Sequence, residues 1–219
     1  YRFKIQEGTN IFDLKKLLLS SKLKLDCPDF NCLSNQLNFT EGTLMPETYF
    51  YNFNSPASNI LIKSQDSFIE YAELLWEKKQ PSNPLKTLDE AIILASIVEK
   101  EAGNNKEKPI IAGVFLNRLN LNMRLQADPT IIYGLLPNFN GNITKLNLQD
   151  SSNRYNTYKI KGLPPTPIAM ISKSSLEAVI LGIPNNYVYF VAKGDGTHYF
   201  STKYADHLKA VRKFQLNKS

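Results

Sequence analysis

The sequence predicts an α+β protein in which a small β-α-β region precedes a mixed domain of helices that ends in a β-hairpin. Residues 1–5 alternate apolar and polar side chains, which is typical of a half-buried strand. The longer segments that follow carry apolar residues at helical spacing. Near the C-terminus, residues 187–192 and 198–200 flank Lys193-Gly194-Asp195-Gly196, and this pattern is a hairpin signal.

The first region continues from its opening strand into a helix and a second strand. Residues 11–22 have the periodicity of an amphipathic helix. A second strand-like run covers residues 43–51. Pro46 within it indicates an edge or entry strand, because proline cannot donate a hydrogen bond to a sheet. Residues 52–58 are polar and contain a proline, so we expect two regions, with a boundary close to residue 53.

Helices begin the second region. Residues 60–79 are helical over most of their length, and the polar stretch after them ends that helix. Thr87 fits the N-cap of the next helix, and Glu90 completes a capping box. Gly103 suits a left-handed residue that ends this helix. A further helix begins at Lys108-Pro109.

The remaining elements are shorter. A polar stretch that ends in Asp128-Pro129 opens a short helix, which Gly134 stops. Residues 138–153 are long, polar and loop-like, and such loops in compact domains are often functional. A final helix follows the hairpin, and its apolar residues at helical spacing are Tyr204, Leu208 and Val211.

The helix that starts after Thr87 brings two carboxylates, Glu99 and Glu101, to its C-terminal end. The carbonyl end of a helix carries partial negative charge, so a carboxyl held there against apolar neighbours should have a raised pKa. A proton retained near neutral pH is what a general acid needs. Glu101 stacks on Val98, Ile97 and Leu94, whereas Glu99 stacks on Ser96, Ala95 and Ile92. Glu101 is therefore the better candidate, although the pattern also fits two solvated glutamates.

Composition excludes several classes of function. An apolar fraction of 42% in 219 residues is ample for a core. The net charge of +6 is scattered, with no basic stripe that would follow a phosphate backbone, so nucleic-acid binding is not expected. An anionic polymer or an acidic membrane surface stays possible. His198 and His207 are distant in sequence and have no further ligand at zinc spacing, so we expect no metal and no cofactor.

The two cysteines, Cys27 and Cys32, are close together in a chain that has no others. This spacing suits a local disulfide in an oxidising compartment. It fits two free thiols in a loop equally well.

The middle of the chain is rich in polar and aromatic side chains at element ends and in loops. Amides and carboxylates suit sugar hydroxyls and N-acetyl groups, and tyrosine faces suit sugar rings. Each residue also has a structural alternative, such as a helix cap, a core tyrosine or a surface pair. No serine nucleophile elbow, phosphate loop or dinucleotide fingerprint is present. The set comprises Glu101, Asn117, Arg118, Gln126, Asp128, Tyr155, Asn156 and Tyr158.

Several motifs in this part resemble those of the endolytic murein transglycosylase family, also called YceG-like, and they follow that family's order. Glu41-Gly42, Pro46-Glu47-Thr48-Tyr49 and the hairpin residues extend the resemblance over most of the chain. The sequence departs from the family pattern at Glu47, Thr166 and Met170-Ile171-Ser172, which puts the loop after Pro165 in doubt. The principal motifs are Leu94-Ala95-Ser96-Ile97-Val98-Glu99-Lys100-Glu101, Asn117-Arg118-Leu119, Met123-Arg124-Leu125-Gln126-Ala127-Asp128-Pro129-Thr130, Tyr155-Asn156-Thr157-Tyr158 and Gly162-Leu163-Pro164-Pro165.

The resemblance implies a lytic cleavage of peptidoglycan. The bond is the β-1,4 link between N-acetylmuramic acid and N-acetylglucosamine within a strand, and the product carries a 1,6-anhydro-muramyl end. The family's catalytic glutamate falls on Glu101, which would act first as acid and then as base. Positioning of the sugars would fall to Gln126, Asp128, Tyr155, Asn156 and Tyr158.

The resemblance also implies an organisation. Residues 1–53 would form a LysM-like region and residues 54–219 the catalytic domain. Family members carry an N-terminal membrane anchor, which would precede Tyr1 and hold the catalytic part on the periplasmic side of the inner membrane. Peptidoglycan strands would be the substrate, and cell-wall synthesis proteins are possible partners.

Two other functions fit the same residues. A hydrolase would use Glu101 with Asp128 or Glu99 as its second carboxylate. A non-catalytic peptidoglycan-binding protein would rely on the LysM-like region at residues 1–53. The products of incubation with glycan strands separate the three alternatives.

Overall fold

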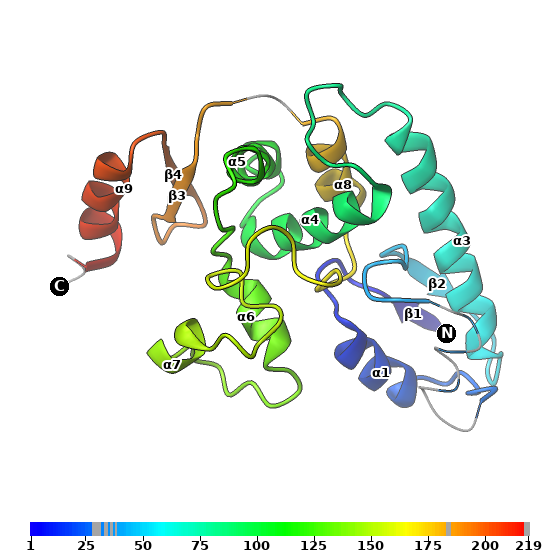
Figure 1. The fold of residues 1–219 in the computed structure, drawn as a ribbon. Helices are drawn as coiled ribbons and strands as arrows, with labels where there is room; N and C mark the ends of the chain where they lie inside the picture. The colour runs from blue at the N-terminus through cyan, green and yellow to red at the C-terminus, as the bar shows by residue number, and fades with distance from the viewer. Residues whose placement is uncertain (28–31, 33–34, 36, 38, 183–184, 217–219) are drawn as a thin grey trace.

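The computed structural model describes residues 1–27, 32, 35, 37, 39–182 and 185–216. Its helices pack around two cores, and its strands form two small antiparallel sheets, which confirms the α+β class (Figure 1). The elements are β1 (Arg2–Lys4), α1 (Ile11–Ser20), β2 (Thr48–Phe50), α3 (Ala57–Trp76), α4 (Leu88–Glu101), α5 (Lys108–Asn120), α6 (Asp128–Gly134), α7 (Lys145–Gln149), α8 (Lys173–Ile180), β3 (Tyr189–Ala192), β4 (His198–Ser201), α9 (Tyr204–Val211) and the π-helical turn η1 (Arg212–Leu216).

The N-terminal region consists of a short sheet and a helix. β1 pairs antiparallel with β2, and Phe3 lies opposite Tyr49. These two residues are the buried positions of their strands, so the alternation seen in the sequence directs them into the core. α1 begins after Asn10, whose side chain accepts a hydrogen bond from the Asp13 amide at 3.0 Å. The predicted strand–helix–strand order is therefore present, with strands of three residues each.

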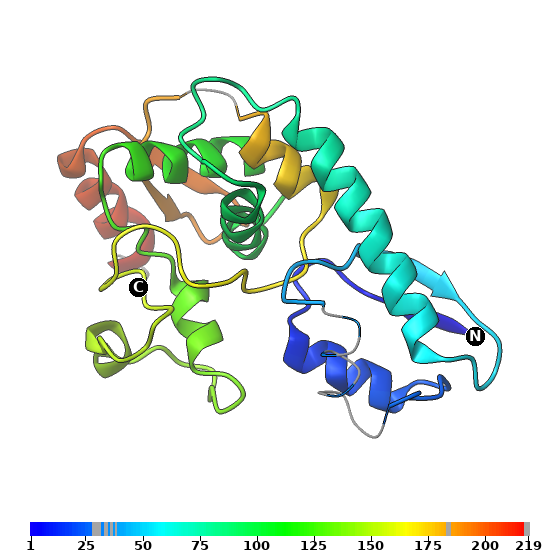
Figure 2. The same cartoon turned by 45° about the vertical axis from the view of Figure 1, so that its right-hand side comes forward.

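α3 links this region to the larger helical core. Its first turns bury Ala57, Ile60 and Leu61 in the N-terminal core, whereas Phe68 and Ala72 belong to the larger one. Figure 2 shows the helix running from beside the N-terminal sheet up to α8. Because one helix serves both cores, they are packed together, and the boundary near residue 53 stays a prediction.

The larger core is built around α4. Seven residues of this helix are buried, and the helix packs on α5 and α8. Figure 1 shows α4 and α5 between α3 on one side and the C-terminal hairpin with α9 on the other. The hairpin is the predicted one, with Phe190 opposite Phe200 in the β3–β4 register.

Contacts between distant residues account for the elements that sequence reasoning misjudged. Gly103 has no left-handed backbone, so the prediction of a left-handed C-cap was wrong. A side chain there would place its Cβ 2.6 Å from the carbonyl oxygen of Gly196, which explains the glycine. α7 lies within the stretch 138–153 that was expected to be a loop. α8 was not predicted.

Two further details concern caps and cysteines. Thr87 caps α4 as predicted, because its hydroxyl accepts from the Glu90 amide at 3.2 Å. The Glu90 carboxylate accepts from the Lys86 amide rather than from that of Thr87, so the second half of the capping box is shifted by one residue.

Cys27 and Cys32 form a disulfide, which decides between the two alternatives for the pair. Among the helices of the described residues, none is both long and apolar enough to cross a membrane.

Candidate active site

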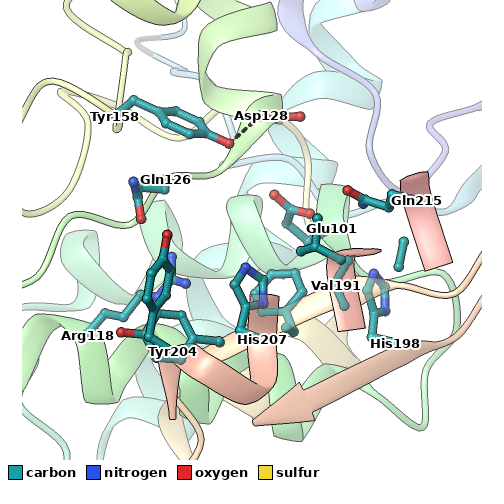
Figure 3. Close-up of a pocket in the computed structure, with 14 residues that line it drawn as sticks. Glu101, Arg118, Gln126, Asp128, Tyr158, Val191, His198, Tyr204, His207 and Gln215 are labelled. Atoms are coloured by element: carbon teal, nitrogen blue, oxygen red, sulfur yellow. Dashed lines mark hydrogen bonds between the residues drawn. The ribbon is translucent and has the colours of Figure 1, made fainter. Parts of the chain in front are cut away.

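A cavity of about 450 Å³ opens where the C-terminal end of α4 faces the hairpin and α9. Figure 3 shows Glu101 in this cavity, between Asp128 and Tyr158 on one side and the two histidines, His198 and His207, on the other. Residues from seven elements and two loops therefore line the cavity that contains this carboxyl. The lining comprises Glu101, Arg118, Gln126, Asp128, Tyr158, Tyr189, Phe190, Val191, Ala192, His198, Tyr204, His207, Val211 and Gln215.

Glu101 is the last residue of α4, and its surroundings favour the protonated carboxyl. Burial and, after it, the charge of Asp128 raise its pKa from 4.5 to about 8, against the opposing effect of Arg118. The residue as a whole is half-buried, because one side of it faces the cavity. No hydrogen bond to its carboxyl comes from the described residues. At neutral pH, Glu101 therefore holds a proton and is free to give it to a bound molecule.

The apolar wall behind Glu101 is the one that helical spacing predicts. Leu94, Ile97 and Val98 are fully buried in the core beneath it. A carboxylate so close to apolar side chains, at the carbonyl end of a helix, is poorly solvated in its charged form. The local sequence of α4 thus accounts for the raised pKa.

Glu99 does not line the cavity of Glu101 and has polar and charged neighbours. Its side chain is 8% exposed and forms an ion pair with Lys108, whose Nζ lies 3.2 Å from Oε1. Its Oε2 also accepts from the hydroxyls of Ser172 at 2.5 Å and Ser175 at 2.6 Å. These hydrogen bonds and the lysine lower the pKa of Glu99 against the effect of burial. Glu99 is therefore an ionised carboxylate that joins α4 to the beginnings of α5 and α8.

Arg118 brings a positive charge to the cavity from α5. The residue is 6% exposed, its Nε donates to the Val188 carbonyl at 2.7 Å, and its Nη1 donates to the Leu125 carbonyl at 2.5 Å. The guanidinium also lies over the Tyr189 ring at 5.8 Å. No carboxylate in the described part of the chain forms an ion pair with it. Its remaining donors are therefore available to a bound molecule.

Three of the predicted substrate-binding residues lie in this cavity. Gln126 has φ +51, a conformation uncommon outside glycine and typical of functional sites. The Asp128 carboxylate accepts a hydrogen bond from the Tyr158 hydroxyl at 2.7 Å. Burial, together with this bond, raises the pKa of Tyr158. Together the three supply amide, carboxylate and phenol groups beside Glu101.

The other two predicted residues lie elsewhere. Asn156 is fully buried, and its amide nitrogen donates to the carbonyls at the end of α7, the shortest bond being 2.7 Å to Asp150. Tyr155 lines a second cavity of about 410 Å³ with Glu41 and bonds to the Thr166 hydroxyl at 2.8 Å. The structure therefore gives Asn156 a structural environment and places Tyr155 outside the cavity of Glu101.

The hairpin and α9 supply the cavity residues that sequence reasoning missed. Both histidines of the chain, His198 and His207, line the cavity. His207 stacks on the Tyr189 ring at 5.2 Å, and burial followed by the charge of Arg118 lowers its pKa, so the ring is neutral. The sequence signal for these two residues was that histidine occurs only twice in the chain, once in the predicted hairpin and once just after it. Within the described ranges, no three histidine, cysteine or acidic side chains are placed to hold a metal.

Comparisons with known proteins identify the family of the chain. A model of the YceG-like family matches residues 1–213. The endolytic murein transglycosylase of Bacillus subtilis (strain 168) is 34% identical over 91% of the chain, and that of Streptococcus pneumoniae (strain R6) is 31% identical over 78%. The chain spans 56% of the first relative and 31% of the second. A crystal structure of a yceG-like protein from Listeria monocytogenes has a TM-score of 0.78 and 29% identity, and the match covers 95% of this chain and 75% of that one.

Proposed function

The chain belongs to the YceG-like family, and from this premise we propose that it is an endolytic murein transglycosylase. It cleaves the β-1,4 bond between N-acetylmuramic acid and N-acetylglucosamine within a glycan strand and leaves a 1,6-anhydro-muramyl end. The relatives that carry this name are 31–34% identical to the chain over 78–91% of its length.

The observation that carries the proposal is the protonated Glu101 in a cavity lined by sugar-binding residue types. Its pKa of about 8 keeps the proton on the carboxyl at neutral pH. No second carboxylate with a free approach to water is needed for a lytic reaction, because the 6-hydroxyl of the substrate replaces water as nucleophile. A hydrolase needs two carboxylates at a fixed separation. Of the two candidates for a second carboxylate, Glu99 is bound by Lys108 and two serines, and Asp128 already accepts from the Tyr158 hydroxyl. This supports a reaction in which Glu101 acts alone.

The reaction needs one proton given and one taken. Glu101 protonates the glycosidic oxygen as the bond from C1 breaks, and the 2-acetamido group of the muramyl sugar stabilises the positive C1. The 6-hydroxyl then attacks C1, and the Glu101 carboxylate takes its proton. The enzyme returns to its starting state without a bound water.

The neighbouring side chains position the sugars. Asp128 and Tyr158, joined by their hydrogen bond, face the cavity with Gln126 and offer acceptors and donors to hydroxyl and N-acetyl groups. Tyr155 and Asn156 support the segment that carries Tyr158. The peptidoglycan substrate places the catalytic part outside the cytoplasm, and the membrane anchor, the LysM-like role of residues 1–53 and the cell-wall partners stay predictions.

Analysis of the products tests the proposal. Purified glycan strands are incubated with the protein, and the new ends are measured by mass spectrometry. A lytic reaction gives anhydro ends, and we expect them in the middle of strands as well as near their ends. Reducing ends heavier by one water would show a hydrolase, and binding without new ends would show a non-catalytic protein; either result overturns the proposal.

A further inference from the structure

The side chain of Glu107 holds both the ring and the backbone of His198. Its Nδ1 lies 2.8 Å from Oε2 of Glu107, and its backbone amide donates to Oε1 of the same carboxylate at 2.9 Å. The two side chains are only 10% and 13% exposed. A carboxylate accepts hydrogen bonds, so Nδ1 carries the hydrogen, and in the neutral imidazole Nε2 then has the free lone pair.

The ring faces are fixed as well. Phe190 meets the imidazole edge to face at 5.3 Å, and Phe200 lies 6.2 Å away on a tilted plane. Within the described residues, Nε2 has no hydrogen-bond partner, while the ring lines the cavity of Glu101. A histidine whose faces and one nitrogen are all fixed presents a single preorganised acceptor to the cavity.

The hairpin that carries His198 is fastened to the segment that follows Glu101. Asn104 donates to the Gly196 carbonyl at 3.2 Å, and Gly103 leaves room for that carbonyl. Glu107 itself caps the start of α5 a few residues later. The acid and the imidazole are therefore held at a constant separation, as a reaction at one sugar requires.

Resting on the proposed function, we infer that His198 is a further catalytic residue, whose Nε2 accepts the N–H of the 2-acetamido group on the muramyl sugar. Glu107 is its positioning residue, because it sets the tautomer and the ring orientation. This contact aims the acetamido carbonyl at C1. It also stabilises the positive charge that the nitrogen acquires.

Glu101 gives its proton to the leaving oxygen as that oxygen separates from C1, and the acetamido oxygen bonds to C1 to give a cyclic oxazolinium ion. The ion keeps its N–H, which stays hydrogen-bonded to His198. When the 6-hydroxyl oxygen bonds to C1, the acetamido oxygen leaves, and the hydroxyl proton passes to Glu101.

Among the other acceptors that line the cavity, the carboxylate of Asp128 is the strongest competitor for that N–H. Two observations favour His198. Asp128 already accepts from Tyr158, and its charge acts directly on Glu101, so both carboxyls lie in one neighbourhood. The acetamido oxygen must reach C1 from the face opposite the leaving oxygen, and Figure 3 shows the histidines on the other side of Glu101 from Asp128.

The test uses His198→Asn, which keeps a donor for Glu107 at the place of Nδ1 and removes Nε2. The matched control is Tyr199→Phe, a neighbouring position on β4 that does not line the cavity. Turnover of glycan strands is measured together with affinity for the thiazoline of N-acetylmuramic acid, a stable analogue of the oxazolinium ion. Affinity for uncleaved strands is measured with Glu101→Gln also present.

We expect His198→Asn to lower kcat roughly 100-fold with little change in KM, the size typical of one lost preorganised group. Thiazoline affinity should fall by a similar factor, since such analogues report transition-state contacts, while affinity for uncleaved strands stays the same. Glu107→Gln should show the same pattern, with losses of kcat and of thiazoline affinity about tenfold smaller, because a neutral acceptor remains. Tyr199→Phe should match the wild type.

Two results would overturn the inference: turnover by His198→Asn within threefold of the wild type, or equal losses of affinity for thiazoline and for uncleaved strands. Circular dichroism of each variant checks that a loss of affinity or turnover does not come from misfolding. If the wild type itself produces no anhydro ends, the proposed function fails, and this inference fails with it. If the wild type produces anhydro ends and His198→Asn cleaves strands at the same rate, only the role of His198 is contradicted and the proposed function stands.

Discussion

Replacing Glu101 with glutamine is expected to stabilise the fold, and the gain should grow as the pH rises. In the folded protein, burial and Asp128 raise the pKa of Glu101 to about 8, whereas the unfolded chain has the ordinary value of 4.5. Between these values the folded state holds a proton that the unfolded state has lost. Because the folded state then binds more protons, the stability of the wild type falls as the pH rises through this window.

The size of the effect follows from the two pKa values. Near pH 4.5 the loss is below about 0.5 kcal/mol, at pH 7 it is about 3 kcal/mol, and at pH 9 it reaches about 5 kcal/mol. Glutamine has the shape of the protonated acid and does not titrate, so Glu101→Gln avoids the loss. For a domain of this length, the gain corresponds to roughly 6–12 °C in Tm at pH 7.

Thermal unfolding of both proteins at several pH values between 4.5 and 9 measures this difference. Other carboxyls, including Glu99, titrate in both proteins and cancel in the comparison. The expected result is that the two melting temperatures coincide near pH 4.5 and separate steadily up to about pH 8. A constant difference across the range, or a wild type that is the more stable at pH 8, would refute the raised pKa and with it the acid role at neutral pH.

Three other changes probe the surroundings of the acid. Asp128→Asn removes a charge that raises the pKa of Glu101, so the alkaline limb of the kcat/KM profile should move to lower pH; an unmoved limb would contradict the coupling. Glu99→Gln leaves Lys108 buried without its partner and should cost about 3 kcal/mol in urea unfolding, whereas a loss below about 1 kcal/mol would show that the pair is dispensable. Gly103→Ala forces its new Cβ against the turn of the hairpin, so we expect a loss of about 1–3 kcal/mol and a lower kcat; wild-type values for both would contradict the close packing.

The parts of the fold that the sequence predicts are those decided by neighbouring residues. The N-cap at Thr87 needs only the amide of Glu90, three residues on. The hairpin follows from a glycine-containing turn between two aromatic runs. The choice of Glu101 over Glu99 needs only the positions one and two turns back along the helix. Each of these signals lies within a few residues.

The parts that it does not predict depend on contacts between distant residues. The first turn of α8 is fixed when the Ser172 amide donates to Glu99, 73 positions away. His198 acquires its partner Glu107 across 91 positions, so the sequence does not show that the two residues form a pair. Asn156 was predicted to bind sugar from its place in the motif, yet its amide nitrogen donates to the carbonyls at the end of α7.

Cleavage of glycan strands by Glu101→Gln tests the central claim most directly. The variant keeps the shape of the side chain and removes the transferable proton, and Glu70→Gln, an exposed position on α3, is the matched control. Release of anhydro-muropeptides is followed by mass spectrometry at neutral pH. We predict that Glu101→Gln loses at least about 100-fold in rate while Glu70→Gln keeps the wild-type rate. Anhydro ends released by Glu101→Gln at the normal rate would contradict the assignment of Glu101 as the acid and base.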